Sequence, residues 1–119
     1  MAFSEHNEQV ALIKWFRLQH KKFAKCLWAI PNGGVRHIGT AVKLKAEGGM
    51  AGVPDLFLMI PAAEYHGLFI EMKVKGGKVS SSQKEFMTVA TAMGYKAVVC
   101  YGFDEAKQAI NDYFTIKSI

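Results

Sequence analysis

The stretch 52-GVPDLFLMIPAAEYHGLFIEMKVK-75 decides the fold of this chain. It contains two apolar runs, 54–60 and 68–74, each bounded by Gly or Pro, which is typical of β-strands. Because only a short connection separates the two runs, we expect them to form an antiparallel hairpin. The hairpin carries one carboxylate at the start of its first run, Asp55, and one near the end of its second, Glu71.

The second run of the hairpin has an unusual pattern of charge. Strand side chains alternate, so Glu71 and Lys73 face one side of the strand and the apolar Ile70 and Met72 face the other. One interpretation is an ordinary strand with one solvated polar face. The other is a functional site, because the hairpin brings the start of its first strand beside the end of its second. Asp55 and Glu71 then share one small volume.

A shared site for two carboxylates has a chemical consequence. Two carboxylates within about 4–6 Å repel each other, and each resists ionisation unless a cation lies between them. Oxygen ligands suit Mg²⁺ or Mn²⁺, which keeps water molecules and uses one or two protein carboxylates. Lys73 beside such a cation is suited to hold or deprotonate a water molecule, or to neutralise charge that develops on a phosphate.

The segments around the hairpin predict further helices and strands. Ser4 is the N-cap of a first helix that reaches about residue 23, and Ser82-x-x-Glu85 is a capping box for a later one. Asp104 caps a last helix. The remaining expected elements are a strand over 25–30, a helix over 35–47 and a strand over 95–101. The order α-β-α-β-β-α-β-α predicts an α/β fold, a mixed sheet with helices on both faces and a parallel last strand.

The composition bounds the class of protein. The 119 residues, half of them hydrophobic, predict one domain over 1–119 and argue against a disordered chain. The longest apolar run is too short to cross a bilayer, and no secretory signal is visible near the N-terminus. We therefore expect a soluble cytoplasmic protein. Cys26 and Cys100 lie among apolar neighbours, where a cysteine is usually a small buried hydrophobe.

The formal charge of +5 is unevenly distributed along the chain. Basic residues crowd the segment 14–25 and recur over 73–78. Such clusters are either solvated surfaces or contacts for the phosphates of a nucleic acid.

The hairpin motif resembles a known family. Pro54-Asp55 followed by Glu71-Met72-Lys73 is similar to the PD-(D/E)xK signature of restriction-endonuclease-like nucleases. Further matching elements indicate the VRR-NUC branch, which includes short stand-alone proteins of phages and bacteria. These elements are Glu8 in the first helix, Ile30-Pro31-Asn32, Gly52-Val53 before the Pro-Asp pair, and Gln83 at the start of a helix. The resemblance covers about residues 5–103.

This resemblance implies a restriction-endonuclease-like fold and a divalent-metal-dependent DNA nuclease using Mg²⁺ or Mn²⁺. The metal ligands would be Asp55, Glu71, the backbone carbonyl of Met72, and Glu8 through water. Lys73 would be the catalytic lysine, and Gln83 would orient Lys73, a water molecule or the phosphate. The residues expected to contact DNA are Lys14, Arg17, Lys21, Lys22, Asn32, Arg36, Lys75 and Lys78.

The resemblance also suggests a homodimer that acts on branched DNA such as a four-way (Holliday) junction, in a bacterial cell or a phage-infected host. The first helix, with Trp15, Phe16 and Leu18, is one candidate for the dimer interface.

Alternatives to this interpretation remain open. The whole protein could be a non-catalytic nucleic-acid-binding module on the same fold, or a small metal-binding enzyme that acts on another phosphate ester. Individually, Glu8 could be an acid favoured by the helix dipole, Gln83 a first-turn helix residue, and Asn32 a turn former.

Overall fold

The computed structural model describes residues 4–31 and 38–116. Its helices are α1 (Glu5–Gln19), the 3-10 helix η1 (Lys21–Cys26), α2 (Ile38–Ala46), α3 (Ser81–Ala92) and α4 (Phe103–Thr115). Its strands are β1 (Leu27–Ala29), β2 (Leu56–Leu58), β3 (Leu68–Lys73) and β4 (Lys96–Tyr101). Apart from the additional η1, the order of elements is the predicted one.

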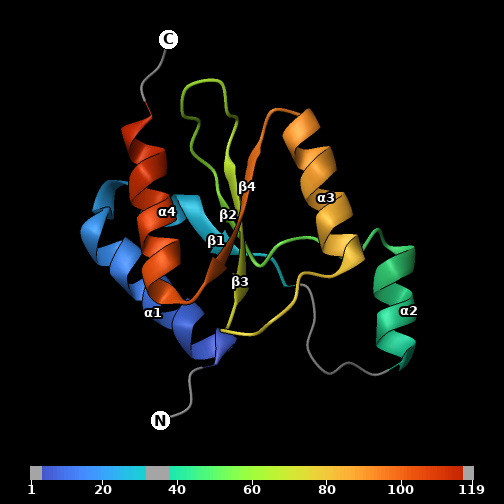
Figure 1. The fold of residues 1–119 in the computed structure, drawn as a ribbon. Coiled ribbons are helices and arrows are strands. Elements are labelled where there is room, and N and C mark those ends of the chain that lie inside the picture. Colours follow the sequence, from blue (N-terminus) through green and yellow to red (C-terminus); the bar gives the residue numbers. More distant parts are fainter. Residues whose placement is uncertain (1–3, 32–37, 117–119) are drawn as a thin grey trace.

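The four strands form one mixed sheet in the order β1-β2-β3-β4 (Figure 1). β2 and β3 pair antiparallel, with Leu56 opposite Ile70 and Leu58 opposite Leu68, which confirms the predicted hairpin. β4 runs parallel to β3, as expected for a strand that returns through a helix. β1 pairs antiparallel with β2 and forms the opposite edge of the sheet from β4.

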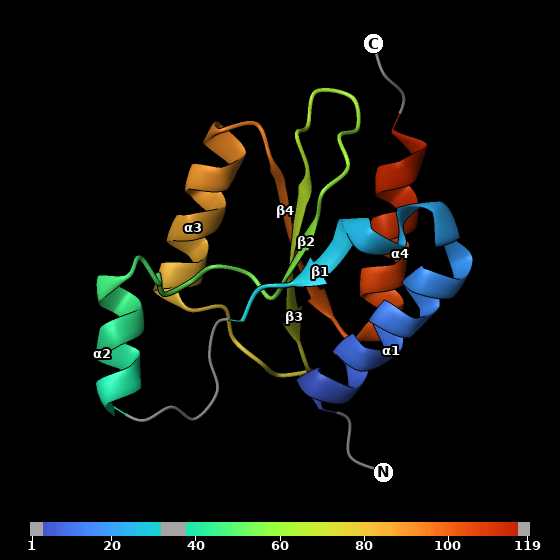
Figure 2. The ribbon, with the colours of Figure 1, turned by 180° about the vertical axis from the view of Figure 1, so that it is seen from behind.

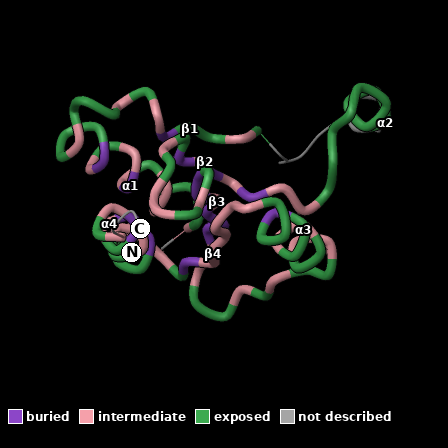
Figure 3. Tube along the Cα trace, turned by 90° about the horizontal axis from the view of Figure 1, so that it is seen from above, coloured by how far each residue is buried: buried purple, intermediate pink, exposed green. Residues whose placement is uncertain are grey.

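Helices cover both faces of the sheet, as the sequence predicts. α1 and α4 lie on one face and α3 lies on the other (Figures 1 and 2). Seen along the strands in Figure 3, the buried residues concentrate at the sheet and at the helix surfaces that face it. Ile70 of β3 and Ile110 of α4 are fully buried in the same core cluster as Phe16 of α1. In contrast, α2 stands apart from the sheet in all three views.

The first helix is shorter than the sequence predicts. Ser4 is its N-cap, as expected, and its hydroxyl accepts a hydrogen bond of 3.1 Å from the backbone N–H of Asn7. The α-helix ends at Gln19 because His20 leaves helical geometry, with φ −121° and ψ 62°. η1 then occupies residues 21–26, so the following strand begins at Leu27 rather than at Lys25.

Two predicted caps are wrong. The capping box of α3 is formed by Ser80 and Gln83 rather than by Ser82 and Glu85, since Ser80 Oγ accepts from Gln83 N–H and Gln83 Oε1 from Ser80 N–H. The N-cap of α4 is Gly102, not Asp104, which lies in the first turn. The run Ser80–Ser82 offers several equivalent hydroxyls, and the one on the residue where the backbone turns into the helix becomes the cap.

Gly52 allows the loop before β2 to approach the start of α3. Its φ is +91°, a region that favours glycine, and a Cβ atom there would overlap the backbone carbonyl of Ser82. The Gly52-Val53-Pro54-Asp55 motif is therefore fixed directly against the first turn of α3, which carries Gln83. In the described residues, no helix is long and apolar enough to cross a membrane.

Candidate active site

The hairpin brings the two predicted carboxylates together. Asp55 directly precedes β2, and its backbone carbonyl accepts a hydrogen bond of 2.8 Å from Ile30 N–H of the neighbouring chain segment. Its Oδ2 atom accepts a second hydrogen bond, also 2.8 Å long, from the backbone N–H of Met72 on β3. Asp55 is thereby held beside the residue that follows Glu71.

Glu71 is buried on the face of the sheet that α3 covers. Only 4 % of its surface is exposed. On the same face of β3, Phe69 packs edge-on against Phe86 of α3, with ring centroids 5.2 Å apart. This face is therefore a packed interface, which rules out the interpretation of β3 as a strand with one solvated polar face.

The surroundings of Glu71 oppose its ionisation. Burial raises its pKa to about 8, and the charge and hydrogen bonding of the Asp55 carboxyl act in the same direction. The positive charge of Lys73 lowers the pKa in part, and the charge of Glu5 raises it further. Without a metal, the Glu71 carboxyl is therefore largely protonated near neutral pH. A bound cation would favour its ionised form.

Lys73 and Gln83 both contact the same oxygen of Glu71. The Lys73 ammonium lies 3.7 Å from Glu71 Oε2, and 13 % of the lysine side chain is exposed. Gln83 Nε2 donates a hydrogen bond of 3.1 Å to that oxygen. The capping box holds the Gln83 amide from its other end, through Ser80 N–H, so the glutamine is fixed at both ends of its amide group.

The acidic residues of α1 contribute in two different ways. Glu8 Oε1 accepts a hydrogen bond of 3.3 Å from the backbone N–H of Phe103, the first residue of α4. It thus supplies the cap that Gly102 lacks. Glu5, one turn earlier, is the α1 carboxylate whose charge acts on Glu71. The sequence analysis named Glu8 and did not consider Glu5, which is an acid in the first turn of the same helix.

The donor set at the hairpin fits a hard divalent cation. It offers the carboxylates of Asp55 and Glu71 and the adjacent backbone carbonyl of Met72, all of them oxygen donors of the kind that Mg²⁺ and Mn²⁺ prefer. The Asp55 carboxyl raises the pKa of Glu71, and a cation bound between the two would relieve this opposition. Among the described residues, no group of three or more His, Cys, Asp or Glu side chains is placed to hold a metal.

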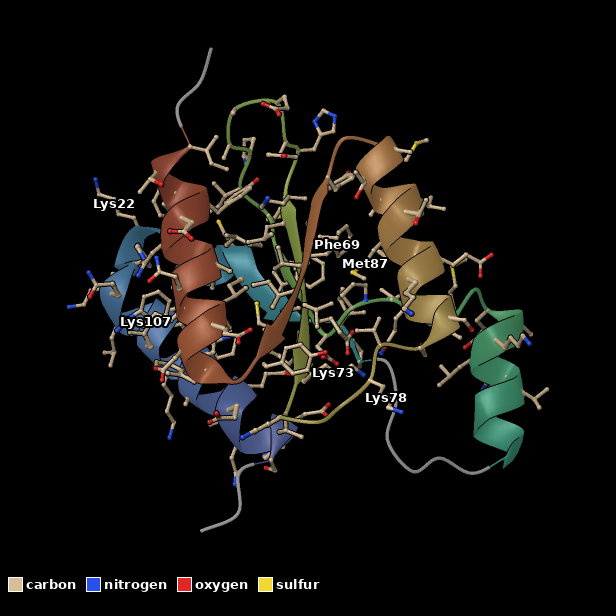
Figure 4. All side chains as sticks on the ribbon, viewed as in Figure 1. Lys22, Phe69, Lys73, Lys78, Met87 and Lys107 are labelled. Carbon is tan, nitrogen blue, oxygen red and sulfur yellow. The ribbon has the colours of Figure 1, made fainter. Side chains whose placement is uncertain are left out.

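The basic residues lie in separate regions of the surface. Lys73 and Lys78 lie near one another below the centre of Figure 4, whereas Lys22 lies at the far side of α4 in that view. The described members of the set predicted to contact DNA are all exposed: Lys14, Arg17, Lys21, Lys22, Lys75 and Lys78. Asn32 and Arg36 lie outside the described residues.

The cysteines are free thiols that take no part in this site. Cys100 is buried in the core and Cys26 is half-buried. Burial raises the pKa of the Cys100 thiol to about 12, so it stays protonated at neutral pH. The interpretation of Cys100 as a small buried hydrophobe is confirmed.

Comparisons with known proteins agree with the fold and the motif. The model of the VRR-NUC domain family matches residues 2–104 of the chain. A solved structure described as a VRR_NUC domain protein is 29 % identical and superposes with a TM-score of 0.87, covering 99 % of this chain and 93 % of that one. No curated protein matches the sequence. The family model and the solved structure point to the same domain.

Proposed function

This chain belongs to the VRR-NUC domain family, and from that premise we propose that it is a divalent-metal-dependent DNA endonuclease that hydrolyses phosphodiester bonds. The family has a nuclease-type fold, which fits a DNA substrate. The observation that carries the proposal is the buried Glu71, held beside Asp55 and contacted by both Lys73 and Gln83. A buried charged cluster of this kind is costly to the fold and is typical of a catalytic site.

Asp55, Glu71 and the Met72 carbonyl would hold the Mg²⁺ or Mn²⁺ ion in this proposal. When bound, such an ion supplies Lewis-acid stabilisation of a phosphate and lowers the pKa of water. Glu8 would assist through water, although its hydrogen bond to Phe103 already occupies one of its oxygens. Glu5 is the further acid of α1 that acts on the site by its charge.

Lys73 is the proposed catalytic lysine. Its ammonium is partly exposed, so a phosphate that approaches the carboxylates meets a positive charge at the entrance of the site. A fixed cation in that place stabilises the negative charge that develops on the phosphate oxygens during hydrolysis. Gln83 is a positioning residue in this scheme, because it holds Glu71 Oε2, the same oxygen with which Lys73 pairs.

The exposed cations would bind the DNA backbone. Lys75 and Lys78 follow β3 and are both exposed, and Lys78 lies near Lys73 in Figure 4. Lys22 of the second basic segment lies on the far side of α4 from these two lysines in that view. This separation favours a branched substrate, such as a four-way junction, and a homodimer that presents two active sites to it.

A non-catalytic nucleic-acid-binding module is the weaker alternative. It would use the same exposed lysines, but it needs no buried Glu71 and no glutamine fixed on it.

Cleavage of end-labelled DNA tests the proposal. We would compare a four-way junction, a flap and a linear duplex in Mg²⁺ and in Mn²⁺, using Lys73→Ala and, as a matched control, Lys84→Ala, which removes an exposed lysine of α3 outside the set expected to contact DNA. We expect symmetrical cuts near the branch that depend on the metal and vanish in Lys73→Ala, while Lys84→Ala still cuts. DNA binding by the wild type without cleavage of any substrate would favour the binding module instead.

A further inference from the structure

A row of aromatic side chains crosses the sheet beside the carboxylates of the candidate active site. Trp28 of β1 lies opposite Phe57 of β2, and Phe57 lies opposite Phe69 of β3. The ring centroids of successive members are 5.4 Å and 4.6 Å apart. Phe69, labelled in Figure 4, packs in turn against Phe86 of α3. The row therefore occupies the face of the sheet on which Glu71 is buried.

The Asp55 carboxylate lies on the same face, one row further along the strands. Asp55 precedes Phe57 by two residues, and side chains two residues apart in a strand share a face. Ile30 N–H donates to the Asp55 carbonyl, so the pairing of β1 with β2 continues to this level. Trp28 is then the diagonal neighbour of Asp55. Diagonal neighbours are about 7–8 Å apart, a distance that a long aromatic side chain spans.

Trp28 is the exposed end of the aromatic row. Its surface is 40 % exposed, although its ring packs edge-on against Phe57 with 71° between the ring planes. α3 covers the other end of the row, where Phe86 packs on Phe69. Among the strands, α3 lies mainly against β4, which is the opposite edge of the sheet from β1. Much of the indole surface can therefore contact a substrate that enters the site.

We propose that Trp28 stacks on an unpaired nucleobase of the DNA, next to the phosphate that the site cleaves. The inference deepens the proposed function and rests on it, because it names the form of DNA that the site prefers. A base inside a continuous duplex must leave its stack before it can meet the indole, which costs free energy. A base in a flap or at a branch point is available without that cost. Trp28 therefore favours DNA with an unpaired nucleotide at the cut, whatever its base, since every base has a face that stacks.

A nucleobase fits this surface better than a protein partner does. Beside Trp28, the large exposed apolar side chain on this part of the sheet is Met59, which follows Phe57 by two residues and is 54 % exposed. A stable protein interface buries about 800 Å² on each partner, far more than these two side chains offer. A protein seated here would also stand over Asp55 and obstruct the DNA. The charge of +5 on the chain attracts a polyanion instead.

DNA binding in the absence of metal tests the proposal. We would compare a flap with a linear duplex of the same sequence for the wild type, Trp28→Leu, Trp28→Phe and the control Met93→Ala. Met93 is 63 % exposed and lies at the end of α3 away from Gln83. Trp28→Leu should lower the affinity for the flap at least about fivefold and leave the affinity for the duplex nearly unchanged. Trp28→Phe, which keeps an aromatic face, and Met93→Ala should retain most of the affinity for the flap.

Salt dependence and fluorescence distinguish stacking from other contacts. Trp28→Leu should leave the slope of log affinity against log salt unchanged, because an indole releases no counterions. Lys78→Ala should instead weaken binding of both DNAs and reduce that slope by about 1. In the wild type, which needs no substitution to fold, the flap should quench tryptophan emission more than the duplex does. Thermal unfolding of each variant reports whether its fold is intact.

Three results would overturn the stacking role of Trp28. They are an equal loss of affinity for flap and duplex in Trp28→Leu, an unchanged affinity of that variant for the flap, and wild-type emission that the flap quenches no more than the duplex does. Failure of the proposed function is a separate outcome, because binding is measured without cleavage. Wild-type protein that cuts no DNA in Mn²⁺ contradicts the nuclease proposal. Mn²⁺-dependent cleavage with the same preference for the flap in the wild type and in Trp28→Leu contradicts only the stacking role.

Discussion

Replacing Glu71 by Gln should stabilise the metal-free protein. Gln keeps the size of the side chain and an oxygen that can accept from Gln83, but it removes the charge that burial and Asp55 oppose. In the folded wild type the pKa of Glu71 is raised from 4.5 to about 8. Between these two pH values the folded protein holds a proton that the unfolded chain has lost. The free energy of unfolding therefore falls as the pH rises through this interval.

The size of the effect follows from the same shift. One pKa unit corresponds to about 1.4 kcal/mol, and the shift of Glu71 already includes the lowering by Lys73, so we expect Glu71→Gln to gain about 4 kcal/mol near pH 8. Near pH 4.5 the gain should nearly vanish, because the wild-type residue is then neutral in the folded protein and about half protonated in the unfolded chain.

Urea unfolding in EDTA at these two pH values measures the difference. Glu64→Gln is the matched control, because Glu64 is exposed in the loop of the hairpin and its replacement should leave the stability almost unchanged. Addition of Mn²⁺ should then reverse the order, since an ion that binds the folded state stabilises it and the wild type offers one more carboxylate ligand. Equal stability of the two proteins in EDTA near pH 8 would refute the reasoning, and so would equal stabilisation of both by Mn²⁺.

Three further predictions concern single residues around the site. Lys73→Ala should lower the rate of DNA cleavage by about a hundredfold or more while leaving Mn²⁺ affinity within a few-fold. A calorimetric titration with Mn²⁺ beside a cleavage assay measures both quantities, and lost Mn²⁺ affinity with unchanged cleavage would contradict the prediction. Gly52→Ala should destabilise the protein by about 2 kcal/mol, because φ is +91° and the added methyl group overlaps the Ser82 carbonyl; an unchanged unfolding midpoint would show that the loop has room to move. Glu8→Ala should lower the free energy of unfolding by about 1 kcal/mol even in EDTA, since it removes the hydrogen-bond acceptor at the start of α4. Glu47→Ala, which alters an exposed acid of the loop after α2, serves as its control.

The pattern of the hairpin predicted the centre of the fold and of the site. Glu71 and Lys73 on one face, with Asp55 at the start of the preceding strand, are fixed by the alternation of strand side chains and by the short connection. These rules are local, so a single sequence is enough to apply them. The burial of Glu71 under α3 was not predictable in this way, because it depends on how α3 packs on the sheet, where Gln83 contacts Glu71 and Phe86 contacts Phe69.

The errors lie where several residues compete for one role. Ser80 and Ser82 are equivalent as caps in sequence, and only the path of the chain into α3 distinguishes them. Likewise Glu5 and Glu8 are both early acids of α1, and the position of α4 decides which of them is drawn to Phe103 N–H. Distant contacts therefore decide between residues that pattern reasoning alone does not distinguish.

The hydrogen bonds of the site also bear on the order in which the protein folds. Asp55 and Met72 are 17 residues apart in sequence, and Glu71 and Gln83 are 12 apart, whereas Glu8 reaches Phe103 across 95 residues. Short loops close at a small entropic cost and therefore form early, while contacts between distant segments form late. We therefore expect the carboxylate pair to assemble from the hairpin and α3 before α1 and α4 close the opposite face. A divalent ion present during refolding would act on this early step, and the protein would refold faster in Mn²⁺ than in EDTA.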